Sequence, residues 1–149
     1  MVSIGPKRGF RGFLAAALVS FSLATQAAGG CVVAKKQGNS LGIHWVAQPG
    51  LSVRAAIEEA KRRLREQGLG LDRYEGLFPQ ANTPLEHAYG VVVRTEYTNA
   101  RGKPRVSYGC GFSDVSQGEA EWAALRDLQS YSWGWTPSKG YEVVERFQY

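Results

Sequence analysis

The sequence predicts an α+β fold in which an antiparallel sheet carries two helices on one face, as a two-layer sandwich. Stretches with a period of two, typical of half-buried strands, are separated by two longer stretches in which apolar residues recur at helical spacing. The order strand, strand, helix, then strand or extended segment is found in residues 31–78 and again in residues 88–149. We therefore interpret residues 28–149 as a single domain built by divergent duplication of a ββαβ unit.

Residues 1–27 have the three zones of a cleavable secretory signal peptide. Three basic side chains precede residues 13–24, which are uncharged and mostly apolar, and small residues follow around Ala27. A stretch of about 12 residues has the length of a signal core, whereas a membrane-spanning helix needs roughly 20. We therefore expect cleavage after Ala27 and a mature protein that is periplasmic or secreted, with no transmembrane segment.

Part of the chain's basic character belongs to this predicted signal peptide. The chain has 18 Lys and Arg residues against 13 Asp and Glu residues, and three of the cations lie before residue 28. The mature part keeps 15 cations against 13 anions, a net charge of +2. This balance gives no reason to expect a nucleic-acid partner.

The first repeat is expected to open with a β-hairpin. Residues 31–34 are apolar, residues 35–40 contain the Gly and Asn of a turn, and residues 41–47 alternate with a period of two. The alternation places four apolar residues on one face of the second strand: Leu41, Ile43, Trp45 and Ala47. His44 falls on the opposite face of this strand.

A helix is expected at residues 53–67, because Ser52 is a favourable N-cap and Gly68 a favourable stop. Its apolar stripe consists of Val53, Ile57, Ala60 and Leu64. Cations on the other face stand four residues from glutamates, which favours a solvated, self-neutralised surface over an anion-binding one. Residues 72–87 are expected to form a loop between the repeats, since Pro79 and other turn-forming residues interrupt them.

The second repeat follows the same plan. Residues 90–97 and 105–112 alternate like the strands of a second hairpin, and Cys110 shares a face with the large side chains of its strand. Ser116 begins a capping box for the second helix. The buried face of that helix is expected to hold Ala120, Ala124, Leu125 and Leu128. Residues 141–149 form the last predicted strand.

Four stretches of the second repeat carry a resemblance to a known class of proteins. AYGVVV, VSYGCGFS, SQGEAEWAALRDL and YEVVERF, all within residues 88–149, resemble small exported bacterial ββαβ domains of unknown function. The resemblance implies export and the ββαβ unit, and it implies no activity. A second cysteine that such domains often carry near the helix end is absent here, where residues 128–131 stand.

Cys31 and Cys110 are the two cysteines of the chain, and two interpretations of them stay open. In an oxidising compartment the pair is expected to form a disulfide, and closing so long a loop is worth on the order of 4 kcal/mol. Residues 28–31 also resemble, loosely, the box before an acylated cysteine in bacterial lipoproteins. In that case Cys31 would carry lipid and anchor the protein to the envelope, and Cys110 would be a lone thiol.

The clearest candidate for a binding site is the aromatic segment that follows the second helix. Its members are Tyr131, Trp133 and Trp135, with Tyr141 close behind. Exposed Trp and Tyr rings offer rigid contact area to a protein partner, and the same rings stack on the sugars of a glycan. The alternative is that Trp133 and Trp135 fold back and cap the core.

Candidates for catalysis are few. His44 and His87 are the two histidines, and neither has a further histidine or cysteine at the spacing of a zinc site. His87, with Glu86 to orient it, would be a general base near neutral pH, and His44 would be a base on the surface. No metal ion and no cofactor is expected.

These observations favour binding over catalysis. The function we expect is an exported binding or inhibitor module, such as an immunity-type protein that occludes another protein of the cell envelope. One alternative is a small envelope-acting hydrolase that uses His87 or His44. The other is a structural envelope lipoprotein acylated at Cys31.

Overall fold

The computed structural model describes residues 27–149. The predicted signal peptide therefore lies outside the described residues, except for Ala27, which is the first residue of a strand. In chain order the elements are β1 (Ala27–Lys36), β2 (Asn39–Pro49), α1 (Val53–Glu66), β3 (Glu75–Thr83), β4 (Tyr89–Thr98), β5 (Pro104–Ser113), α2 (Gln117–Tyr131), the 3-10 turn η1 (Pro137–Lys139) and β6 (Glu142–Gln148).

The chain forms two units of identical topology. The strand order is β2-β1-β3 in the first sheet and β5-β4-β6 in the second, with every pair antiparallel. In each unit the first strand is central, its hairpin partner lies on one side, and the strand after the helix lies on the other. The predicted α+β class and the duplicated ββαβ unit are confirmed.

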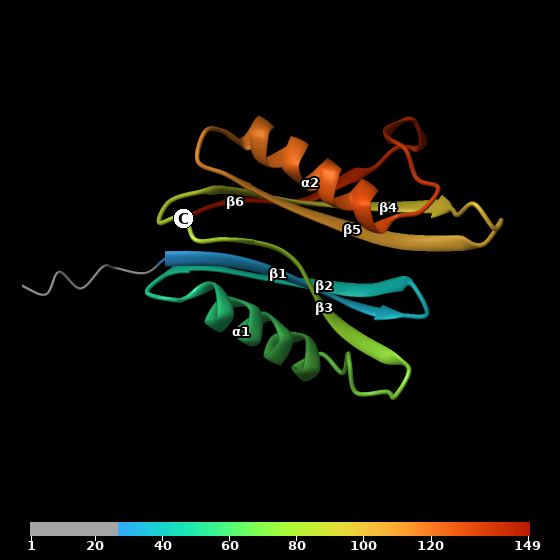
Figure 1. The fold of residues 1–149 in the computed structure, drawn as a ribbon, viewed down its shortest axis with the longest axis horizontal. Coiled ribbons are helices and arrows are strands. Elements are labelled where there is room, and N and C mark those ends of the chain that lie inside the picture. Colours follow the sequence, from blue (N-terminus) through green and yellow to red (C-terminus); the bar gives the residue numbers. More distant parts are fainter. Residues whose placement is uncertain (1–26) are drawn as a thin grey trace, which may run out of the picture.

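The two units stack as four layers rather than as one sheet with both helices on one face. Figure 1 shows the sheets facing each other, with α1 outside the first sheet and α2 outside the second. The reason is that the central strands are apolar on both faces. Val32 of β1 packs under α1, whereas the neighbouring Cys31 packs between the sheets. A strand of this kind needs cover on both sides, and the second sheet supplies the second cover.

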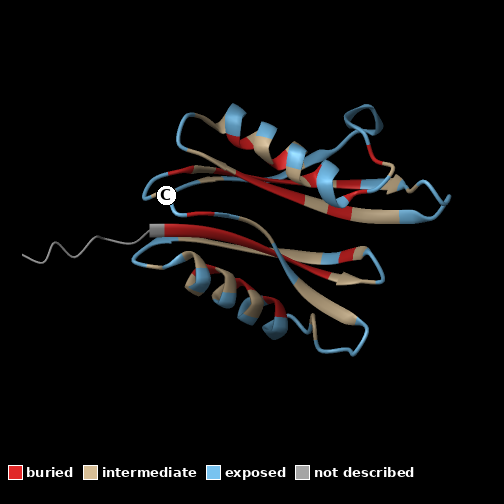
Figure 2. Cartoon of the chain, viewed as in Figure 1, coloured by how far each residue is buried: buried red, intermediate tan, exposed pale blue. Residues whose placement is uncertain are grey.

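Three apolar clusters follow from this layering. The cluster under α1 contains Val32, Ala34, Ala60 and Leu64, and the cluster under α2 contains Val91, Val93, Ala120, Ala124, Leu128 and Trp135. The third lies between the sheets and contains Cys31, Val92 and Cys110, with Ile43, Trp45, Ala81, Tyr108, Phe112 and Phe147 packed around them. Figure 2 shows the buried residues along the strands and along the helix faces turned toward them.

Local features of the sequence place both helices as predicted. The side-chain oxygen of Ser52 accepts the N–H of Ala55, and that of Ser116 accepts the N–H of Glu119, each at 3.1 Å. Helix α2 lies unusually close to β5, because a Cβ on Gly109 would stand 2.2 Å from the carbonyl oxygen of Ala124. Glycine at this position is therefore required by the packing of the helix.

The segment between the repeats is not the loop that its prolines predict. Residues 75–83 form β3, which pairs with β1, and only the remainder of residues 72–87 is irregular. Pro79 is tolerated because β3 is an edge strand, and the register shifts beside it so that the residue after it is left out of the ladder. The prediction of a loop at residues 72–87 is therefore wrong over most of that range.

Within residues 27–149, no helix is long and apolar enough to cross a membrane.

Candidate functional site

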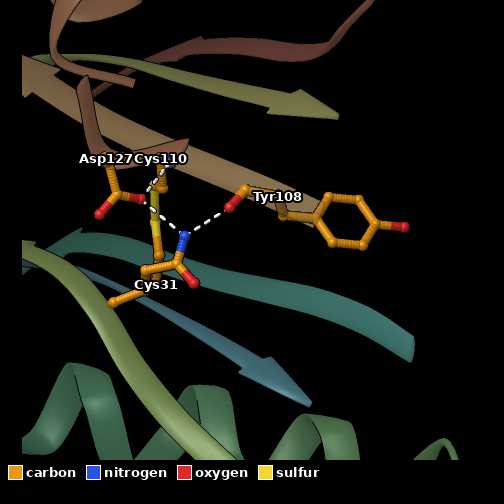
Figure 3. Close-up of a disulfide and its surroundings, with 5 residues drawn as sticks. Cys31, Tyr108, Cys110 and Asp127 are labelled. Atoms are coloured by element: carbon orange, nitrogen blue, oxygen red, sulfur yellow. Dashed lines mark hydrogen bonds between the residues drawn. A yellow bond between two sulfur atoms is a disulfide. The ribbon is translucent and has the colours of Figure 1, made fainter. Parts of the chain in front are cut away.

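Cys31 of β1 and Cys110 of β5 form a disulfide that joins the two units (Figure 3). Their Cα atoms are 6.5 Å apart, and both side chains are buried between the sheets. The disulfide predicted from the sequence is therefore present. The disulfide uses the Cys31 sulfur atom that acylation would need. In addition, the four residues before Cys31 pair with β2 inside the sheet.

A polar cluster lies beside the disulfide on the free edge of β5. Asp127 of α2 accepts hydrogen bonds through Oδ2 from the backbone N–H of Cys110 at 2.9 Å and from Gln80 Nε2 at 2.8 Å. Gln80 Nε2 also donates to the carbonyl oxygen of Tyr108 (Figure 3). The two side chains therefore satisfy a backbone N–H and a backbone C=O of an edge strand, which would otherwise lack partners.

The carboxyl of Asp127 is partly withdrawn from water. Burial raises its pKa to about 6, although the hydrogen bonds from Gln80 and the Cys110 N–H and the charge of Lys35 act in the opposite direction. The partners of this carboxyl are an amide and a backbone N–H, so the cluster holds no activated nucleophile. Its geometry is that of a clamp between β3, β5 and α2.

The two histidines lie in separate surroundings. His87 is exposed in the turn between β3 and β4. His44 of β2 lines a cavity of about 410 Å³ between β2, α1 and β6, and burial lowers its pKa, an effect to which Arg63 adds. The cavity lining contains no Ser, Thr or Cys side chain. The acid there, Glu59, is a weak base, because hydrogen bonds from Arg62 and Arg63 lower its pKa to about 2.

No group of three or more His, Cys, Asp or Glu side chains among the described residues could hold a metal ion.

The two tryptophans of the aromatic segment have different environments. Trp135 is 2% exposed, packs in the cluster under α2, and donates its indole N–H to the carbonyl oxygen of Gly140 at 3.1 Å. Trp133 is 64% exposed, and the guanidinium of Arg101 lies 5.7 Å from its ring centroid. The fold-back alternative therefore describes Trp135, and Trp133 is left at the surface.

The two tyrosines also point to different places. Tyr131 is half exposed, and the ammonium of Lys35 from the first unit lies 4.6 Å from its ring centroid. The hydroxyl of Tyr141 donates to the carboxylate of Glu121 on α2 at 2.8 Å. The four aromatic residues singled out from the sequence are therefore not gathered in one site.

Tyr141 instead belongs to a groove along the outer side of α2, which we call the α2 groove. It has a volume of about 380 Å³ and a mostly apolar lining. Its lining residues are Gly118, Glu121, Trp122, Leu125, Arg126, Gln129, Pro137 and Tyr141. Helix α2 therefore has one apolar face packed on the sheet and a second, partly apolar face turned toward solvent.

Trp122 is the large aromatic residue of this groove that the sequence interpretation missed. It is 65% exposed, although it is the largest apolar side chain of the helix. A signal was present in the sequence. Trp122 follows Ala120 of the buried stripe by two positions, which is a rotation of about 200° around a helix and points the ring away from the core.

Comparison of the chain with known protein families, curated proteins and solved structures finds no match. The resemblance of residues 88–149 to exported ββαβ domains stays a prediction.

Proposed function

We propose that this protein is an exported binding module of the inhibitor or immunity type, which occludes a partner protein in the cell envelope through the α2 groove. The observation that carries the proposal is the exposure of Trp122 beside an apolar groove of about 380 Å³. Large rings in such surroundings are enriched among the residues that dominate binding energy at protein interfaces.

Export is supported by two independent features. The first 27 residues have the composition of a signal peptide, and the two cysteines form a disulfide. Disulfides form and persist in oxidising compartments and are rare in the cytosol. A secreted or periplasmic partner is therefore part of the proposal.

The chemistry of the described residues supports binding better than hydrolysis. His44 has no neighbouring nucleophile in its cavity, and the acid beside it is held in ion pairs by arginines. His87 is exposed in a turn. The α2 groove, in contrast, combines apolar walls with a few polar groups, which is the usual composition of a recognition site.

The test is capture and titration of the partner with matched variants. Immobilised wild type, Trp122→Ala and Tyr74→Ala are exposed to envelope extract of the native host, and the retained protein is identified, purified and titrated calorimetrically. Tyr74 is the control because it is an aromatic residue of the first unit with 53% of its surface exposed.

We expect Trp122→Ala to raise Kd by about 30-fold, the equivalent of a hot spot of about 2 kcal/mol. Tyr74→Ala should bind as the wild type does. Both rings are exposed, so the thermal midpoint should change little in either variant. A partner that binds Trp122→Ala and wild type equally would rule out the α2 groove as the contact surface.

A further inference from the structure

One end of the second unit carries four cations, which we call the basic end. Arg101 and Lys103 lie in the turn between β4 and β5, Arg105 lies at the start of β5, and Lys139 lies in η1. None of the four forms an ion pair with a carboxylate within the part of the chain that the structure describes.

The basic run on α1 is different in kind. Lys61, Arg62 and Arg63 are all paired with glutamates of their own helix, as the sequence predicted for a self-neutralised surface. Residues 61–63 are therefore neutralised within α1, although Arg54 and Arg65 of the same helix form no ion pair among the described residues. At the basic end, by contrast, all four cations lack one.

Contacts between two loops hold the basic end in place. Lys139 Nζ donates to the carbonyl oxygens of Thr98 and Gly134, at 3.3 Å and 2.5 Å, and so ties η1 to the end of β4. A Cβ on Gly134 would stand 2.7 Å from the backbone nitrogen of Ala100. Figure 1 shows the β4–β5 turn and the loop after α2 at the same end of the molecule. The cations are therefore presented on an organised surface.

The basic end adjoins the α2 groove. Pro137 lines the groove, and Lys139 lies two residues further along η1. Arg126, on the rim of the groove, also has no ion pair within residues 27–149. The carboxylate of the groove, Glu121, is already bound by Arg146 at 2.6 Å and by the hydroxyl of Tyr141. Among the residues that line the groove, the charge left without an ion pair is therefore the cation of Arg126.

We propose that the α2 groove binds an acidic segment of the partner protein. An apolar side chain of that segment would lie between Trp122 and Tyr141, and its carboxylates would face Arg126 and the basic end. The inference rests on the proposed function and adds the chemistry of the partner. Apolar contacts at the centre with charges at the rim are the arrangement of protein interfaces, in which complementary charge sets the association rate and the partner choice.

The first experiment uses the four indole N–H signals of the full mature protein in a nitrogen–proton correlation spectrum. The probes are two synthetic peptides of about 15 residues with leucine at helical spacing, one with glutamate and one with glutamine at all other positions. The glutamate peptide should shift the signal of Trp122 in the groove and that of Trp133 beside Arg101. Trp135, which is buried under α2, should keep its signal.

The glutamate peptide is expected to bind at least tenfold more tightly than the glutamine peptide, and this advantage should shrink as salt is raised, because salt screens exposed charges. The double variant Arg101→Glu with Lys103→Glu should lose the advantage. The control is Arg54→Glu with Arg65→Glu on α1, which changes the net charge equally at two exposed positions of the first unit and should keep it.

Three outcomes of the peptide experiment would overturn the inference. They are the absence of a Trp122 shift with the glutamate peptide, equal binding of both peptides, and equal losses in the two double variants. Vesicles of anionic phosphatidylglycerol that bind the protein through the same cations would assign the basic end to a lipid surface instead. If the captured partner depends on Trp122 but is insensitive to salt and to charge reversal, the proposed function stands and the acidic segment is refuted.

Discussion

Replacing Asp127 by Asn tests whether burial of this carboxyl is a cost to the folded protein. Asp127 Oδ2 accepts two hydrogen bonds, from the N–H of Cys110 and from Gln80 Nε2. Asn has the same shape and can place its carbonyl oxygen where Oδ2 lies, so both hydrogen bonds are retained. What the substitution removes is the ionisation of the side chain.

The sign of the effect follows from the pKa of Asp127, which burial raises from its ordinary value of 3.8 to about 6. Between these two values the folded protein keeps a proton that the unfolded chain has released, so the free energy of unfolding falls as the pH rises. A difference of about two pKa units corresponds to about 3 kcal/mol, and water reaching the partly exposed carboxyl makes this an upper value. Asp127→Asn cannot ionise and should escape this loss.

The assay is urea denaturation of wild type and Asp127→Asn at a series of pH values, followed by tryptophan fluorescence. Below about pH 4 the two proteins should be equally stable, and above about pH 6 the variant should be more stable by about 1 to 3 kcal/mol. Asp114→Asn, which removes an exposed carboxylate, is the control and should show no such pH-dependent gain. A variant less stable than the wild type at pH 7 would show that hydrogen bonding to the carboxylate outweighs its burial, and would refute the reasoning.

Two further predictions concern the joints between the layers. Replacing Cys31 and Cys110 together by Ser should lower the free energy of unfolding by about 4 kcal/mol, because the disulfide closes a loop with a sequence separation of 79; a loss below 1 kcal/mol in calorimetry would contradict it. Gly109→Ala should cost more than 2 kcal/mol, since its Cβ would stand 2.2 Å from a carbonyl oxygen of α2. Gly118→Ala, where the nearest contact is 3.7 Å away, should be neutral or stabilising in the same urea titration.

Local patterns were sufficient to predict both helices and every strand except β3. Ser52 and Ser116 begin helices because a hydroxyl next to free backbone N–H groups caps a helix whatever the rest of the fold does. The alternation around Trp45 placed that ring on the buried face of β2, because side chains of a strand alternate between its two faces. The duplication was visible for the same reason, since both units repeat these local signals.

Features that depend on neighbours distant in sequence were missed or left open. Pro79 predicted a loop because its strand-breaking effect is local, whereas its tolerance depends on the edge position of β3. Trp133 and Trp135 look equivalent in the sequence, and only the packing of Trp135 under α2 separates them. Asp127 gave no signal at all, because its partners on β3 and β5 come from other parts of the chain.

The sequence by itself indicated the duplicated ββαβ plan and left the disulfide as one of two alternatives for the two cysteines. It could do so because periodicity, helix caps and cysteine count are properties of short stretches or of composition. Only the tertiary structure decided that the units stack sheet to sheet, that Asp127 and Gln80 clamp the joint, and that Trp122 and Tyr141 share a groove. The physical reason is that an apolar face has to be buried, but the residues of that face do not specify which other surface buries it. That choice is made when the two units pack against each other.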